Sequence, residues 1–95
     1  MPRYVSLIRF TDKGAREIKN STARAEAFDQ AAAKAGVRVE AQYWTLGSYD
    51  GILILNADTE QKALRCLAEL ESKGTVRTNT MPAFDAKEFK ALTGR

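Results

Sequence analysis

The sequence predicts an α+β fold of the ferredoxin-like type: a βαββαβ sandwich with a four-stranded antiparallel sheet and an extra C-terminal helix. Three observations lead to this prediction. The 95 residues fit one ordinary domain that spans 1–95. Segments with strand composition and segments with helical spacing of apolar residues follow one another in this order. The first and third strand segments are apolar on both sides, and the split βαβ arrangement places these two strands in the centre of the sheet.

Each strand segment has a composition that suits its predicted place. Residues 3–11 (RYVSLIRFT) and 49–57 (YDGILILNA) are apolar on both sides, which is typical of strands covered on both faces. Residues 37–44 alternate between apolar and polar, and residues 75–83 are rich in threonine and contain Pro82, so both are expected at the sheet edges. The residues expected on the apolar side of segment 37–44 are Val37, Val39, Ala41 and Tyr43.

Capping residues predict where the first long helix begins and ends. Ser21 is expected to cap a helix over residues 22–35, and Gly36 is expected to end it. The apolar stripe of this helix consists of Ala25, Phe28, Ala32 and Ala35. The preceding residues 12–20 have a weaker helical signal, because Gly14 interrupts it.

Two further helices are predicted in the same way. A capping box of Asp58 and Gln61 is expected to open a helix that continues to about residue 72, before Gly74. Its buried stripe consists of Ala63, Cys66, Leu67 and Leu70, so the single cysteine is expected to be a small core residue. The C-terminal helix is predicted from a second capping box, Asp85 with Glu88, and from a hydrophobic staple, Phe84 with Phe89.

Composition excludes several classes of function. The net charge of +3 comes from 15 basic and 12 acidic residues that are interleaved, so we expect no nucleic-acid partner. No apolar run reaches the roughly 18 residues of a membrane span and the N-terminus lacks a signal peptide's apolar stretch, so we expect no membrane partner and a cytoplasmic location. With no histidine, one cysteine and no phosphate-binding glycine loop, we expect no metal and no cofactor.

The predicted sheet also indicates self-association. Two helices cover one face of a four-stranded sheet, whereas the first and third strands are apolar on both faces. A soluble monomer rarely exposes an apolar patch larger than a few hundred Å². We therefore expect a homodimer or a higher oligomer that pairs through the sheet face opposite the helices.

Residues 43–51 (YWTLGSYDG) contain three of the eight aromatic residues, two glycines and one acid. One interpretation is a pocket for an apolar ligand, in which Asp50 accepts a hydrogen bond or a proton. The residues that would line this pocket are Tyr43, Trp44, Tyr49 and Asp50. The other interpretation is a structural turn, in which Gly47 adopts positive φ and Asp50 accepts backbone N–H groups.

Arg9 and Arg77 lie on the predicted first and fourth strands and are also candidate ligand-binding residues. If these strands are neighbours, the two guanidinium groups form a clamp for an anion or a carboxylate, because their planar N–H donors match such oxygens. The alternative is ordinary ion pairing with Asp50, with Glu40 or with a partner subunit.

Four segments resemble the GYD domain family, namely YVSLIRFTDKG, STARAEAF, YWTLGSYDGILIL and VRTNTMPAFDAKEF. The resemblance covers roughly residues 4–89, and the family's Gly-x-Tyr-Asp signature falls on Gly47, Tyr49 and Asp50. It implies a small bacterial protein of the dimeric α+β barrel group, whose biochemical activity is not established for the family. Gly51 and Asn56 depart from the larger apolar residues expected at their positions.

Two functions of different classes follow from these features. The first is a binding or sensor module whose dimer encloses a small apolar or carboxylated molecule, because no complete set of nucleophile, base and orienting group is found. The second is a cofactor-less isomerase or monooxygenase, by analogy of fold. In that enzyme Asp50 would accept the proton, and Tyr49 or Arg9 would steady the developing oxyanion.

Overall fold

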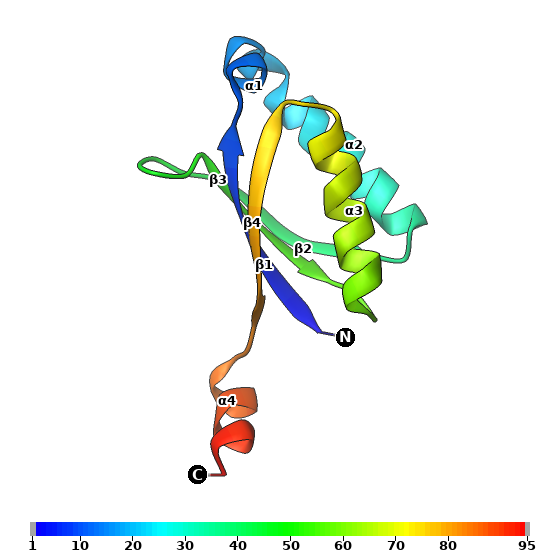
Figure 1. Ribbon diagram of the computed structural model, residues 1–95, viewed down its shortest axis with the longest axis vertical. Coiled ribbons are helices and arrows are strands. Elements are labelled where there is room, and N and C mark those ends of the chain that lie inside the picture. Colours follow the sequence, from blue (N-terminus) through cyan, green and yellow to red (C-terminus); the bar gives the residue numbers. More distant parts are fainter. Residues whose placement is uncertain (1, 95) are drawn as a thin grey trace.

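The computed structural model describes residues 2–94 and has the predicted order of elements. They are β1 (Arg3–Phe10), α1 (Asp12–Arg16), a 3₁₀ turn (Ile18–Asn20), α2 (Ser21–Lys34), β2 (Arg38–Trp44), β3 (Gly51–Asn56), α3 (Glu60–Ser72), β4 (Val76–Ala83) and α4 (Ala86–Thr93). The sheet order is β2-β3-β1-β4 with every pair antiparallel. Helices α2 and α3 lie on one face of this sheet (Figure 1). The ferredoxin-like topology with β1 and β3 in the centre is therefore confirmed.

The core lies between the sheet and these two helices. From β3, Leu53 and Leu55 are almost completely buried. The predicted stripes of α2 and α3 meet them with their small and apolar residues: Phe28, Ala32, Ala63, Cys66 and Leu67. None of the helices within residues 2–94 is long and apolar enough to cross a membrane.

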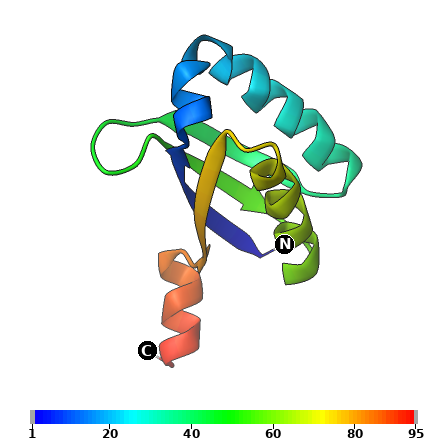
Figure 2. The same ribbon diagram turned by 45° about the horizontal axis from the view of Figure 1, so that its top comes forward.

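The opposite face of the sheet is open. Strands β1 and β3 present a second set of apolar side chains there, and these are only half-buried: Val5, Leu7, Ile52 and Ile54. In the described part of the chain no helix covers this face (Figure 2). The second apolar side that the sequence predicts for β1 and β3 is therefore available for contact with another molecule.

Strand β2 differs from its prediction because a β-bulge interrupts it between Val39 and Ala41. Directly paired residues share a face, and Val39 pairs with the buried Leu55, whereas Gln42 pairs with the buried Leu53. The expectation that Val37, Val39, Ala41 and Tyr43 share one side is therefore wrong beyond Val39. The bulge turns Ala41 and Tyr43 to the open face and brings Gln42 and Trp44 beneath α2.

Two predicted helix starts shift by one residue. Ser21 is the first residue of α2 and not its cap, since Asn20 holds that position. Thr59, rather than Asp58, caps α3 by accepting the Lys62 N–H at 3.2 Å. In each case a neighbouring residue has the extended or turn conformation that a cap requires.

Of the two features predicted at the start of the C-terminal helix, the structure has the capping box but not the hydrophobic staple. The capping box of Asp85 and Glu88 is present. Phe84 and Phe89 remain exposed to 57% and 61%, so the expected hydrophobic staple does not bury them.

Gly14 in the short helix α1 is a point of close backbone contact. A Cβ atom at this position would lie 2.0 Å from the carbonyl oxygen of Thr75. Next to it, Thr11 donates its N–H to Thr75 O at 3.0 Å and its hydroxyl to Gly74 O at 2.6 Å. Glycine is therefore needed where α1 passes the start of β4, although it weakens the helix.

Candidate functional site

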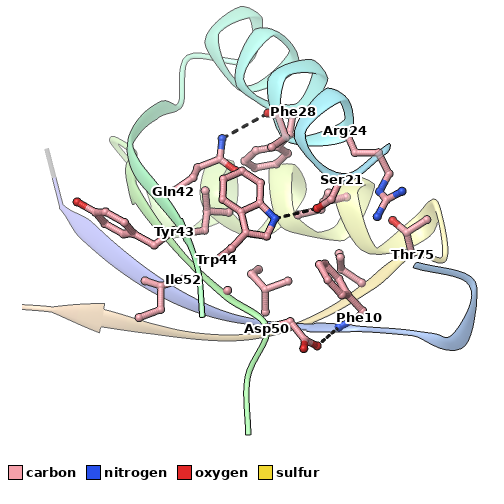
Figure 3. Close-up of a pocket in the computed structure, with 16 residues that line it drawn as sticks. Phe10, Ser21, Arg24, Phe28, Gln42, Tyr43, Trp44, Asp50, Ile52 and Thr75 are labelled. Carbon is pink, nitrogen blue, oxygen red and sulfur yellow. Dashed lines mark hydrogen bonds between the residues drawn. The ribbon is translucent and has the colours of Figure 1, made fainter. Parts of the chain in front are cut away.

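The candidate site is a cavity of about 70 Å³ between the N-terminal half of α2 and the sheet (Figure 3). Its wall is mainly apolar, with side chains from β1, β3 and both long helices. The larger apolar residues that line it include Ile8, Phe10, Phe28, Trp44, Leu53 and Leu70. An apolar wall with a few polar groups is the usual composition of a small-molecule site.

Trp44 forms the outer wall of this cavity. Its side chain comes from the end of β2 and half of its surface is exposed. The indole N–H donates a hydrogen bond of 2.9 Å to Ser21 Oγ, in the first turn of α2 (Figure 3). One hydrogen bond therefore joins the aromatic wall to the helix above it.

Most polar side chains of the cavity are already bonded to the protein. Gln42 donates through Nε2 to Asp29 Oδ1 at 2.6 Å and to the Ala25 carbonyl at 3.3 Å. Arg24 donates through Nη1 to the Glu17 carbonyl at 2.8 Å. These bonds hold Gln42 and Arg24 in defined orientations around an apolar interior.

Ser21, Arg24 and Gln42 were not predicted from the sequence as site residues. A signal was present, because Ser21 and Arg24 each lie four residues before a predicted stripe position, Ala25 and Phe28 respectively, and so share that face of α2. Gln42 was missed because the bulge reverses its expected side.

Asp50 lines the same cavity but holds the end of the hairpin. Its Oδ2 accepts the N–H of Phe10 at 2.8 Å, and its own N–H donates to the Ile8 carbonyl at 2.8 Å. Its carbonyl also accepts the N–H of Thr45 at 2.9 Å. Asp50 thus joins β1 to the β2–β3 connection, and the catalytic role suggested for it stays a prediction.

The connection between β2 and β3 has the turn chemistry that the sequence suggests. Gly47 has a φ of +105°, in the region that favours glycine. The hydroxyl of Thr45 donates to the Tyr49 carbonyl at 2.7 Å, which closes the loop from the other side. Gly47 and Asp50 of the Gly-x-Tyr-Asp signature therefore have structural roles.

Tyr43 lines the cavity at its edge, whereas Arg9, Tyr49 and Arg77 lie outside it, so the structure does not form one pocket from all the candidate residues. The ring of Tyr43 points away from the cavity and is 60% exposed (Figure 3). Tyr49 stacks against Arg9, with the guanidinium carbon 4.8 Å from the ring centre. Arg9 pairs directly with Arg77 across β1 and β4, as their predicted proximity requires.

The expected ion pairs of these arginines are not formed within residues 2–94. Asp50 bonds to the Phe10 N–H, and Glu40 accepts from Asn56 Nδ2 at 3.0 Å. Arg9 and Arg77 line a shallow depression of about 240 Å³ with Leu7, Tyr49 and Asn79. Two like charges in register are unfavourable, and the role of this pair as an anion clamp stays a prediction.

Cys66 is a buried core residue, as predicted, with 6% of its surface exposed. Burial raises the pKa of its thiol, and the nearby Glu69 carboxylate raises it further. Both effects disfavour the reactive thiolate. Among the described residues there is also no group of three or more Asp, Glu or Cys side chains that could hold a metal ion.

The fold and cavity together define a ferredoxin-like α+β domain with an aromatic-walled site on the helical side of its sheet. The GYD domain family matches residues 4–93, which is nearly the whole chain. The protein therefore belongs to the GYD domain family, as the four sequence segments suggested.

One relative has a name that refers to protein binding. The glutamine synthetase and cystathionine beta-lyase binding protein of Thermus thermophilus is 33% identical over 92 residues. The match covers 96% of this chain and 97% of that protein.

Solved structures share the fold. A feast or famine regulatory protein from M. tuberculosis, complexed with L-methionine, has a TM-score of 0.68 at 16% identity over 90% of this chain. This chain spans 52% of that protein. TTHA0845 from Thermus thermophilus has a TM-score of 0.58 at 24% identity, covering 90% of this chain and 96% of that one. At these identities the similarity establishes the fold alone.

Proposed function

We propose that this protein is a non-enzymatic binding module, acting as a single domain, that takes a small apolar molecule into the cavity beneath α2. The cavity carries the proposal: its wall is mainly apolar, and the side chains of Ser21, Arg24, Gln42 and Asp50 are fixed by bonds to the protein. The name of the Thermus relative supports a binding role rather than a catalytic one. If this chain also binds other proteins, we propose that a ligand in the cavity changes the strength of that binding.

Ligand entry is proposed to move Trp44. A cavity of about 70 Å³ is smaller than the roughly 300 Å³ at the low end of ligand pockets, although it exceeds the space of a single water. The indole is half-exposed and held by one hydrogen bond to Ser21, so displacing it costs about 1 kcal/mol. A larger apolar ligand would replace the indole contacts with its own.

The fluorescence of Trp44 tests this proposal, because it is the single tryptophan of the chain. A panel of short-chain alcohols, aldehydes, carboxylic acids and aromatic compounds is titrated while emission and melting temperature are recorded. Ala25→Leu places a larger side chain in the cavity, and Ala27→Leu makes the same change on the exposed side of α2. Compounds should shift emission and melting temperature in the wild type and in Ala27→Leu, but not in Ala25→Leu. Equal responses of both variants would contradict the proposal.

A carboxylated ligand has a second proposed location at Arg9 and Arg77. Arg9 and Arg77 are paired across β1 and β4 and line one depression without an acidic partner in residues 2–94, and a carboxylate would relieve the repulsion of their charges. Acetate and succinate should raise the melting temperature of the wild type more than that of Arg77→Gln. Equal stabilisation of both proteins would show that the pair is not an anion site.

We also propose that two copies pair through the open sheet face. The half-buried apolar side chains on β1 and β3 supply the contact area. Light scattering at micromolar concentration should give at least twice the mass of one chain, and Ile54→Lys should reduce it. A monomer in the wild type would refute this pairing.

A further inference from the structure

Helix α4 projects from the body of the molecule as an arm (Figure 1). None of its residues is buried, and Phe89 and Leu92, three positions apart on one side, are 61% and 67% exposed. The radius of gyration is 14.1 Å, whereas a compact chain of this length has about 12 Å. The arm thus exposes an apolar stripe that the described chain does not cover.

One polar side-chain contact joins the arm to β1, and a second lies within the start of the arm. Glu88 accepts from Arg3 Nη1 at 3.1 Å and also bonds to the Asp85 N–H in the capping box. Only Phe84 and Asp85 lie between β4 and α4, and the helix projects beyond the end of β4, apart from α2 and α3 (Figure 1). The arm is therefore presented to a different molecule.

A groove of about 990 Å³ lies on the helical side, between α3 and β4. Its apolar lining includes Leu64, Leu67, Ala68 and Pro82, and Leu64 is 70% exposed. The charged residues that line it, Glu60 and Glu71, are both acidic. The groove thus combines an apolar floor with a negatively charged rim.

We infer that α4 of one copy docks into the α3–β4 groove of a second copy. Phe89 and Leu92 would cover the apolar floor, and Lys87 and Lys90 would lie near the acidic rim. Neither lysine is in an ion pair within residues 2–94, so both are available for this contact. An amphipathic helix in an apolar groove is a common mode of recognition.

The dimensions and the symmetry of this contact agree with a second copy as the occupant. The eight residues of α4 span about 12 Å and the thirteen residues of α3 about 20 Å, so the arm fits along the groove. Both complementary surfaces belong to the same chain, which is the condition for a reciprocal two-fold contact. This contact lies on the side of the sheet opposite the proposed sheet-face pairing and does not depend on the ligand cavity.

Disulfide trapping tests the inference directly. In a Cys66→Ala background, a tagged copy with Leu64→Cys is mixed with an untagged copy with Leu92→Cys, and mild oxidation should join them. Arg65→Cys, an exposed position on α3 outside the groove, replaces Leu64→Cys as the matched control and should give far less product. Equal trapping of the two positions overturns the inference. So does a crosslink that forms within one chain when both cysteines are on it at high dilution.

A charge exchange keeps Cys66 in place and gives a second, independent measurement. Lys87→Glu with Lys90→Glu should weaken self-association about tenfold in sedimentation equilibrium, and so should Glu60→Lys with Glu71→Lys. Mixing the two double variants gives opposite charges at both arm–groove contacts of the mixed pair, and should recover association between them. Unchanged association in both variants, or no recovery on mixing, would refute the arm exchange while leaving the Trp44 ligand assay unaffected.

Discussion

Replacing Asp50 separates a structural role of the Gly-x-Tyr-Asp signature from a functional one. The carboxylate accepts the Phe10 N–H at 2.8 Å at the end of β1. Asp50→Ala removes this acceptor and leaves a half-buried backbone donor without its partner. Asp50→Asn keeps an oxygen at the same position but removes the negative charge.

The expected loss in the free energy of unfolding follows from the type of hydrogen bond that each Asp50 variant removes. A hydrogen bond to a charged group contributes about 1.5–3 kcal/mol, and the partial exposure of Asp50 favours the lower part of that range. We expect Asp50→Ala to lower the free energy of unfolding by about 2 kcal/mol and Asp50→Asn by about 1 kcal/mol. In a domain of this size, 1 kcal/mol corresponds to about 4–8 °C in melting temperature.

Urea unfolding monitored by circular dichroism measures both losses, and the Trp44 titration measures ligand response in the folded fraction. A structural Asp50 predicts a stepwise loss of stability with the ligand response retained. If both variants keep the wild-type urea midpoint while the ligand response disappears, the structural reasoning is refuted and Asp50 belongs to the binding machinery. If both variants keep the wild-type urea midpoint but lose a measured enzymatic turnover, the catalytic role of Asp50 is supported.

Three further predictions follow from individual contacts. Gly14→Ala should lower the free energy of unfolding by about 3 kcal/mol, because the added Cβ would lie 2.0 Å from Thr75 O. Gly47→Ala should lower it by only about 1 kcal/mol, because its φ of +105° is unfavourable for alanine but no atom lies within 4 Å of the added Cβ. Urea midpoints of the two variants measure this difference. Ser21→Ala should shift Trp44 emission to longer wavelength with a stability loss of about 0.5 kcal/mol; unchanged emission would show that the hydrogen bond does not position the indole. The folded-state pKa of Cys66 is raised above the ordinary value of about 8.5, so its contribution to stability is complete below that pH and is lost as the pH rises through the folded pKa. Cys66→Ala should remove this alkaline loss in a series of unfolding curves.

The sequence predicted the architecture because its strongest signals are local. The apolar runs of β1 and β3, the threonine-rich β4 and the stripes of α2 and α3 each depend on one segment, and they agree with one topology. Gly36 follows the end of α2 and Gly74 follows the end of α3, as expected. Helix starts were off by one residue at Ser21 and Asp58, because several adjacent polar residues can act as caps.

The candidate site was harder to predict, because it depends on the relative positions of segments far apart in the chain. Asp50 reaches Phe10 across forty residues, and Gly14 touches Thr75 across sixty-one. No spacing rule within one segment encodes these distances. The aromatic density of residues 43–51 indicated the right region, but it did not show that its side chains point to opposite faces of the sheet.

The bulge in β2 explains why these side chains diverge and how one segment can serve two surfaces. A regular strand would have turned Tyr43 toward the core with Val39, and Trp44 toward the open face. The extra residue between Val39 and Ala41 reverses this assignment, so that Trp44 reaches Ser21 and closes the cavity while Tyr43 joins the open face. Ligand-dependent movement of Trp44 would therefore act on the strand that also contributes to the proposed sheet-face contact. A shift of Trp44 on ligand binding should then change self-association, and Ala25→Leu should abolish that change while leaving association without ligand intact.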